Sequence, residues 1–195
     1  MEPFLEAAAR NTRRAEAIIE RFQLEQVWRE AGIEVRRVGS LAMGLLMKHR
    51  DIDLHLYSAP VDIGRSFAVV ARLAQTGGVE AVSFANRLAT DERCIEWHLT
   101  LCDDEGERWS IDMIHIETGS RYDGYFERMA ARIAAALTPE TRRTILQLKW
   151  ETPDDEHIPG IAYYMAVLRD GVRSMPAFRS WLHEHPLTGI VEWIP

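Results

Sequence analysis

The sequence has 195 residues, of which 47% are hydrophobic and 27% are charged, and its formal net charge is −7. This length and composition allow one domain, or a small domain with an appendage, to bury a core without metals or disulfides, and they exclude a wholly disordered chain. The acidic balance disfavours a long nucleic-acid track, so nucleic acid is not expected as a partner.

The positions of the two cysteines are informative about the cellular compartment in which the protein works. Cys94 and Cys102 are eight residues apart on one expected strand, which spans about 26 Å and is too far for a disulfide. The chain opens without a basic leader and has no apolar run of membrane-spanning length. We therefore expect a cytoplasmic protein without a membrane anchor, and the sequence does not indicate an oligomeric state.

Helices and strands are mixed in the first 118 residues. Apolar residues at helical spacing predict helices over 4–30, 41–47 and 61–76. Alternating apolar and polar residues predict strands over 33–38, 51–57, 79–84, 94–101 and 108–116.

The last two strands are expected to form a hairpin around Asp103-Asp104-Glu105-Gly106. Both apolar faces should pack on the same side, which requires a loop of odd length with Gly106 in the left-handed conformation as a bulge. This arrangement aligns four polar side chains on the opposite face, with Glu96 opposite Asp112 or His98 opposite Ser110.

After Gly119 the pattern is helical only. Helices are predicted over 122–137, 139–150, 158–174 and 176–184, and Thr138-Pro139 is a typical helix start. The fold class is therefore α+β, with a mixed, mainly antiparallel sheet flanked by helices over residues 1–118 and a helical bundle over residues 119–195.

The candidate catalytic residues follow the first expected strand, begin the second and lie within the last. Gly39-Ser40 lies between a strand and a short helix, where free backbone amides and a hydroxyl suit phosphate oxygens. Asp51 and Asp53 point to one face of a strand, and two adjacent carboxylates favour a cation between them. Asp112, in an otherwise mostly apolar strand, is the candidate third carboxylate. This combination indicates magnesium-assisted phosphoryl or nucleotidyl chemistry.

Gly39-Ser40, the following interval, Asp51-Ile52-Asp53-Leu54 and the later Asp112 resemble the polymerase-β-like nucleotidyltransferase superfamily, in its minimal and antibiotic-modifying branches. The resemblance implies a nucleotidyltransferase core in which Gly39 and Ser40 bind the β and γ phosphates. It also implies that the three aspartates hold Mg²⁺, with two ions expected, and that Asp112 receives the acceptor proton.

The helix segment ending in Lys149-Trp150 is similar to a helix in several members whose lysine meets the triphosphate, which makes Lys149 a third nucleotide-binding candidate. The sequence departs from the family pattern at Lys48-His49-Arg50, where small polar residues are common. This departure bears on the substrate more than on the mechanism.

Several other side chains have two interpretations. Glu96 is either a neighbour of Asp112 or an auxiliary base, and His55 lies at the edge of the site or packs beyond it. Tyr163 and Tyr164 either stack on a base or fill the core. We expect structural roles for His98 and His115, and a solvated basic face for Arg10, Arg13 and Arg14.

The function that follows is transfer of a nucleoside monophosphate from a nucleoside triphosphate, with ATP expected, to an acceptor hydroxyl, releasing pyrophosphate. The acceptor is expected to be a small molecule. The alternatives are nucleotidylation of a protein partner, as in toxin-neutralising enzymes, or a non-catalytic nucleotide-binding module.

Overall fold

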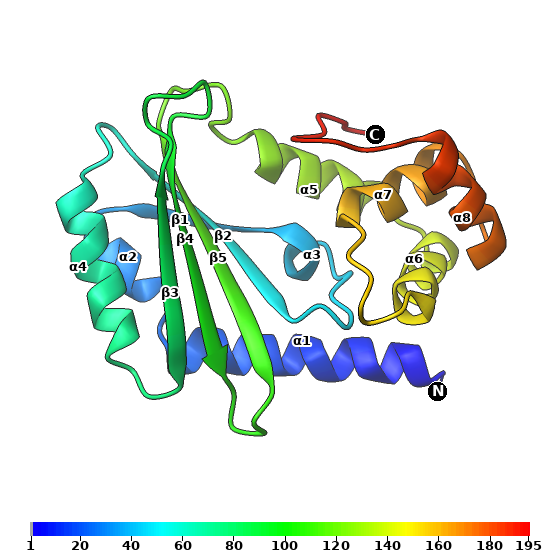
Figure 1. Ribbon diagram of the computed structural model, residues 1–195, viewed down its shortest axis with the longest axis horizontal. Coiled ribbons are helices and arrows are strands. Elements are labelled where there is room, and N and C mark those ends of the chain that lie inside the picture. The colour runs from blue at the N-terminus through cyan, green and yellow to red at the C-terminus, as the bar shows by residue number, and fades with distance from the viewer. Residues whose placement is uncertain (1) are drawn as a thin grey trace.

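A computed structural model describes residues 2–195. Its centre is a five-stranded sheet in the order β1-β2-β5-β4-β3 (Figure 1). The strands are β1 Glu34–Val38, β2 Asp51–Ser58, β3 Val79–Asn86, β4 Cys94–Cys102 and β5 Arg108–Glu117. β2 and β5 run parallel, and the other neighbouring pairs are antiparallel. The mixed, mainly antiparallel sheet predicted from the sequence is thus confirmed.

Helices surround the sheet and form the second half of the chain. The first four are α1 Pro3–Arg21, α2 Gln26–Glu30, α3 Gly39–Ala42 and α4 Ile63–Ala74. The later ones are α5 Tyr125–Ala136, α6 Pro139–Glu151, α7 Gly160–Tyr164 with a π-helical turn Met165–Arg169, and α8 Met175–Glu184. None of the helices within residues 2–195 is long and apolar enough to cross a membrane.

Three helix predictions need correction. The helix expected over 4–30 is interrupted after Arg21, because Gln23 takes a φ of +50° and turns the chain so that Leu24 is fully buried. The short helix covers Gly39–Ala42 rather than 41–47. The helix expected over 158–174 ends at Arg169, because Gly171 adopts a φ of +71° and the amide of Val172 bonds back to the carbonyl of Ala166.

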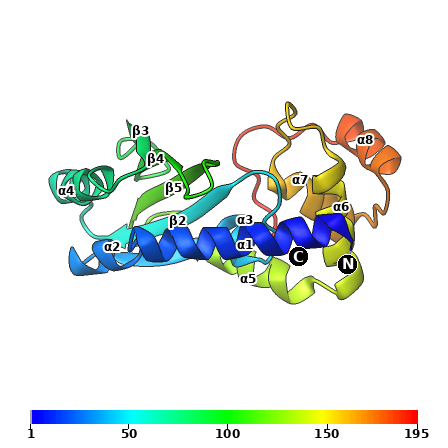
Figure 2. The ribbon, with the colours of Figure 1, turned by 90° about the horizontal axis from the view of Figure 1, so that it is seen from below.

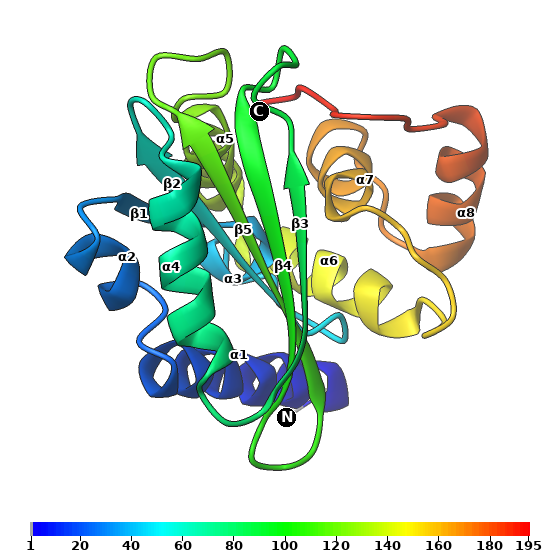
Figure 3. The same cartoon turned by 60° about the vertical axis from the view of Figure 1, so that its left-hand side comes forward.

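The sheet has one apolar face and one polar face. Apolar side chains of β2, β4 and β5, such as Leu54, Trp97 and Ile111, pack against α2, α4 and the C-terminal half of α1. Figure 3 shows α4 on this side and α5 on the opposite side of the sheet. The polar alternate positions of the same strands therefore face α5 and the C-terminal helices.

The C-terminal helices have their own hydrophobic cluster. Ile133, Leu146 and Phe178 from α5, α6 and α8 belong to it, together with Phe4 and Ala8 from the first turns of α1. Figure 2 shows α1 running beneath both halves of the molecule. α1 therefore joins the sheet core to the helical cluster.

The predicted hairpin is present, with Gly106 at a φ of +79°. The polar face also agrees with the prediction, but the register is shifted: His98 lies opposite Asp112, and Glu96 lies opposite Ile114. The physical reason is the turn, where the amide of Asp103 bonds to the carbonyl of Glu107 and the Asp103 carboxylate accepts from two turn amides. Cys94 and Cys102 are both free thiols, as expected.

Candidate active site

The turn after β1 brings the backbone against a carboxylate. Gly39 has a φ of +68°, and a Cβ atom at this position would stand 1.8 Å from Oδ2 of Asp53. Only glycine therefore fits between β1 and the Asp53 side chain. The next residue, Ser40, is buried, and its Oγ has no hydrogen-bond partner within residues 2–195. A buried hydroxyl of this kind is a donor left available to a ligand.

The three predicted aspartates meet on the polar face of the sheet. Asp51 and Asp53 begin β2, and Asp53 is paired in register with Asp112 on the parallel neighbour β5. Neighbouring strands are about 4.8 Å apart, so the backbones of this pair are adjacent. Burial, followed by the charges of Asp51 and Asp112, raises the pKa of Asp53 to about 8. Burial and the neighbouring carboxylates thus disfavour the ionised form of Asp53 when no cation is bound.

Asp112 is held by two neighbours through one oxygen. Nδ1 of His98 lies 2.7 Å from Oδ1 of Asp112, and the Ser110 hydroxyl donates to the same oxygen at 3.0 Å. The structural role expected for His98 is compatible with this contact, which fixes the position of the Asp112 carboxylate.

Lys149 reaches the site from α6. Its Nζ donates to the carbonyl of Leu45 at 3.0 Å and to the hydroxyl of Tyr164 at 3.2 Å. Burial lowers the pKa of Lys149 to about 8, although Asp51 and Asp53 act in the opposite direction. In turn, the charge of Lys149 acts to lower the pKa values of Asp51 and Asp53.

A cavity of about 260 Å³ connects these elements. It is lined by Gly39, Ser40, Asp51, Asp53 and Lys149, and by the two tyrosines of α7. Both tyrosines are buried, and Lys149 Nζ lies 5.9 Å from the ring centre of Tyr163 and 5.3 Å from that of Tyr164. Asp112 does not line this cavity. It lies beside the cavity, because it is paired in register with Asp53, which does line it.

The remaining candidates lie outside this cavity. His55 is buried beside α5, where its Nδ1 is 3.3 Å from Glu127. His115 is fully buried on the apolar side, near Trp28, in agreement with a structural role. Arg14 departs from the expected solvated face, because it forms an ion pair with Asp103 in the hairpin turn.

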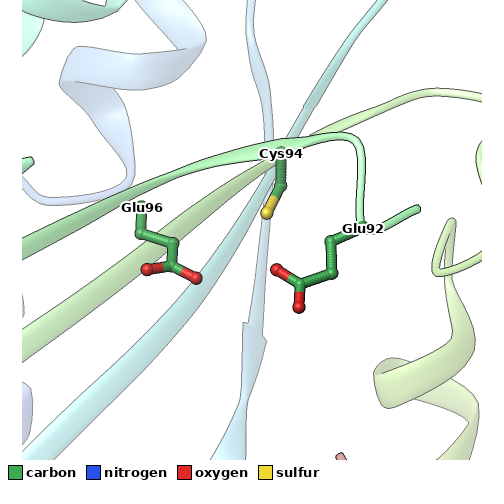
Figure 4. Close-up of side chains that lie close together, drawn as sticks. All are labelled: Glu92, Cys94 and Glu96. Carbon is green, nitrogen blue, oxygen red and sulfur yellow. The ribbon is translucent and has the colours of Figure 1, made fainter. Parts of the chain in front are cut away.

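A separate cluster of side chains lies at the start of β4 and in the segment just before it. Ligand atoms of Glu92, Cys94 and Glu96 lie within 4.8 Å of one another (Figure 4). Arg87 pairs with Glu96 at 2.8 Å and with Glu92 at 3.5 Å. Burial, together with the two glutamates, raises the pKa of the Cys94 thiol to about 12. The ion pairs with Arg87 balance part of the charge of the two glutamates.

Comparisons with known proteins identify the fold. No protein-family model and no curated protein matches the sequence. Among solved structures, a Cid1 poly(U) polymerase with MgGTP bound has a TM-score of 0.57 and 18% identity, covering 82% of this chain and 50% of its own. A cytoplasmic RNA terminal U-transferase has a TM-score of 0.55 and 17% identity, with 82% and 48% covered.

The non-canonical poly(A) polymerase complex GLD-2–GLD-3 gives a TM-score of 0.54 at 12% identity, with 86% of this chain and 58% of that chain covered. These structures belong to the polymerase-β-like nucleotidyltransferase superfamily, so the resemblance inferred from the sequence is confirmed at the level of the fold. The chain spans about half the length of these structures.

Proposed function

We propose that the protein is a metal-dependent nucleotidyltransferase that moves a nucleoside monophosphate from a nucleoside triphosphate to an acceptor hydroxyl. The observation that carries the proposal is one cavity lined by the Gly39-Ser40 turn, by Asp51 and Asp53, and by Lys149. A phosphate-binding turn, a carboxylate pair and a buried lysine around one space are the groups that a metal-bound triphosphate requires.

The acidic groups fit a divalent cation. Burial and the neighbouring Asp51 and Asp112 raise the pKa of Asp53, and a cation between these carboxylates would offset both effects. Asp51, Asp53 and Asp112 would hold Mg²⁺, with two ions proposed, because oxygen ligands suit this metal. The ions would supply charge neutralisation and Lewis acidity at the transferred phosphate.

The chain's own residues then bind the triphosphate and move one proton. Gly39 and Ser40 contact the β and γ phosphates, and Lys149 exchanges its bonds to Leu45 and Tyr164 for a phosphate oxygen. The acceptor oxygen attacks the α phosphorus, the α–β anhydride bond breaks, and pyrophosphate leaves with the bonding electrons. The hydroxyl proton passes to Oδ2 of Asp112, whose other oxygen is held by His98.

The acceptor is proposed to be a small hydroxyl compound, in keeping with the net charge of −7. The neighbours are named as poly(U) and poly(A) polymerases and an RNA U-transferase, which gives no support to excluding nucleic acid. RNA therefore belongs in the test as a second acceptor class, beside a protein acceptor.

The test is an assay of the purified protein with Mg²⁺ and each of the four nucleoside triphosphates. The acceptors are aminoglycoside-like and lincosamide-like compounds, a short single-stranded RNA and a protein fraction. Magnesium-dependent pyrophosphate release together with an acceptor adduct of one nucleoside monophosphate, seen by mass spectrometry, is the expected result. Calorimetric binding of nucleotide without turnover on any acceptor would instead identify a non-catalytic binding module.

A further inference from the structure

A second cavity adjoins the first on the side of α1. It measures about 380 Å³ and lies between α1, the segment before β2 and the end of α6. Lys48 and His49 line both cavities, so the two spaces are neighbours. This size is within the range of small-molecule sites.

The lining of the second cavity is basic. Arg10, Lys48 and Arg50 contribute three cations, two of them from the Lys48-His49-Arg50 segment that departs from the family pattern. Arg10 has no ion-pair partner within the described chain. Lys48 pairs with Asp154, the one carboxylate of the lining, and Arg50 pairs with Glu107. The side chains of Asp154 and Glu107 are 84% and 45% exposed. Such exposed pairs are weak, so the cavity favours an anion in a protein that is acidic as a whole.

Two buried polar atoms in this lining lack partners. Asn11 is 4% exposed and donates from Nδ2 to the carbonyl of Met47 at 2.7 Å, whereas its Oδ1 accepts nothing from residues 2–195. Nε of Arg50 is likewise a buried donor without an acceptor in that range. A ligand with both an acceptor oxygen and a hydroxyl or amino donor would satisfy both atoms.

An aromatic side chain completes the cavity. Trp150 is 40% exposed at the end of α6, and Lys48 Nζ lies 6.0 Å from its ring centre. An exposed indole beside cations is a surface on which a planar ring stacks while its phosphate meets the charges.

We propose that this cavity is a second binding site, for a small ligand that carries a phosphate and an aromatic ring, as a nucleoside monophosphate does. Its phosphate meets Arg10 and Arg50, a sugar hydroxyl donates to Asn11, and its base stacks on Trp150. Binding at this site does not depend on nucleotidyl transfer in the neighbouring cavity.

The experiment is calorimetric titration of the whole chain with AMP, inorganic phosphate, ribose 5-phosphate and adenosine. We expect AMP to bind more tightly than the other three, because only AMP combines phosphate, hydroxyl and ring. Trp150→Ala should weaken AMP binding about ten-fold, from the loss of stacking. Arg10→Gln should weaken it about five-fold, from the loss of a phosphate contact.

Two controls make the result specific. Arg13→Gln removes the same charge from an exposed position on the same helix outside the cavity lining, and should leave the AMP affinity within about two-fold. Asp53→Asn should remove binding of Mg·ATP and leave binding of AMP unchanged. Thermal unfolding verifies that each variant is folded.

The proposal is overturned if AMP does not bind, or if Asp53→Asn loses AMP binding together with Mg·ATP binding. It is also overturned if Arg10→Gln and Trp150→Ala behave like Arg13→Gln. Failure of the transfer assay with AMP binding intact would remove the proposed activity and leave this site standing.

Discussion

At the scale of single residues, Gly39 shows how a backbone position can determine a site. Its replacement by alanine should cost about 1–2 kcal/mol for the left-handed conformation. It should also displace Asp53, because the new Cβ would stand 1.8 Å from Oδ2. We expect loss of Mg·ATP binding by calorimetry and a lower free energy of unfolding in urea.

Gly171 provides the matched control for that variant. It has a φ of +71°, and nothing lies within 4 Å of an added Cβ. Gly171→Ala should show the conformational cost alone and keep nucleotide binding. If the two alanine variants bind Mg·ATP equally well, Gly39 does not hold Asp53 in a functional position.

The aspartates are also tested one residue at a time. Asp53→Asn should abolish turnover, because the metal loses a charged ligand. In EDTA at pH 8 the variant should be more stable than the wild type by about 1 kcal/mol, since a like charge is removed from a crowded site. Adding Mg²⁺ should stabilise the wild type and not the variant. The exposed Asp91→Asn is the control, and undiminished turnover in Asp53→Asn would contradict the assignment of the metal site.

At the scale of elements, the β4–β5 hairpin separates what the sequence could predict from what it could not. The alternation of apolar and polar residues was enough to predict which side chains share a face, and that Gly106 has a positive φ. The pairing of His98 with Asp112 depends on how Asp103 closes the turn and on its ion pair with Arg14 of α1. Arg14 and Asp103 are 89 residues apart in the sequence, so no local sequence pattern predicts their contact.

This register makes His98 a positioning residue for Asp112. His98→Ala should lower kcat about ten-fold and leave the KM for the triphosphate unchanged, because Asp112 loses its orientation and the phosphate contacts remain. His98→Asn should recover part of the rate, since its amide can donate to the same oxygen. Glu96→Gln is the control on the same face and should retain activity within about two-fold. A larger loss in Glu96→Gln than in His98→Ala would restore Glu96 as the auxiliary base.

At the scale of the whole molecule, the polar face of the sheet could be predicted from the sequence. The packing of the C-terminal helices against that face could not. The Gly-Ser turn and the carboxylate spacing predicted a nucleotidyltransferase fold through their resemblance to the polymerase-β-like superfamily. The bonds of Lys149 to Leu45 and Tyr164 depend on how the helical cluster packs against the first turns of α1. Periodicity identifies each helix separately, but it carries no information on which helices meet.

The free energy of unfolding should depend on pH through His115, a residue of β5 whose ring packs near Trp28 of α2. Its Nε2 lies 2.8 Å from the Ser58 hydroxyl, and its ring is fully buried beside Trp28. Burial lowers the pKa of His115 from 6.5 to about 4. Above pH 6.5 the ring is neutral in both the folded and the unfolded chain, so this contribution to stability is complete. Between pH 6.5 and pH 4, His115 is protonated in the unfolded chain but remains mostly neutral in the folded chain. The free energy of unfolding should therefore fall by about 3 kcal/mol over this range.

Urea unfolding of the wild type and of His115→Gln at several pH values between 7 and 4 tests this expectation. The glutamine amide can still reach Ser58 but does not titrate, so the variant should lose less stability on acidification than the wild type, whatever its stability at pH 7. His183→Gln, at an exposed position of α8, controls for the loss of a histidine, because the carboxylates contribute the same background to all three proteins. Parallel stability curves for the wild type and His115→Gln would mean that the buried ring takes up its proton without unfolding the sheet.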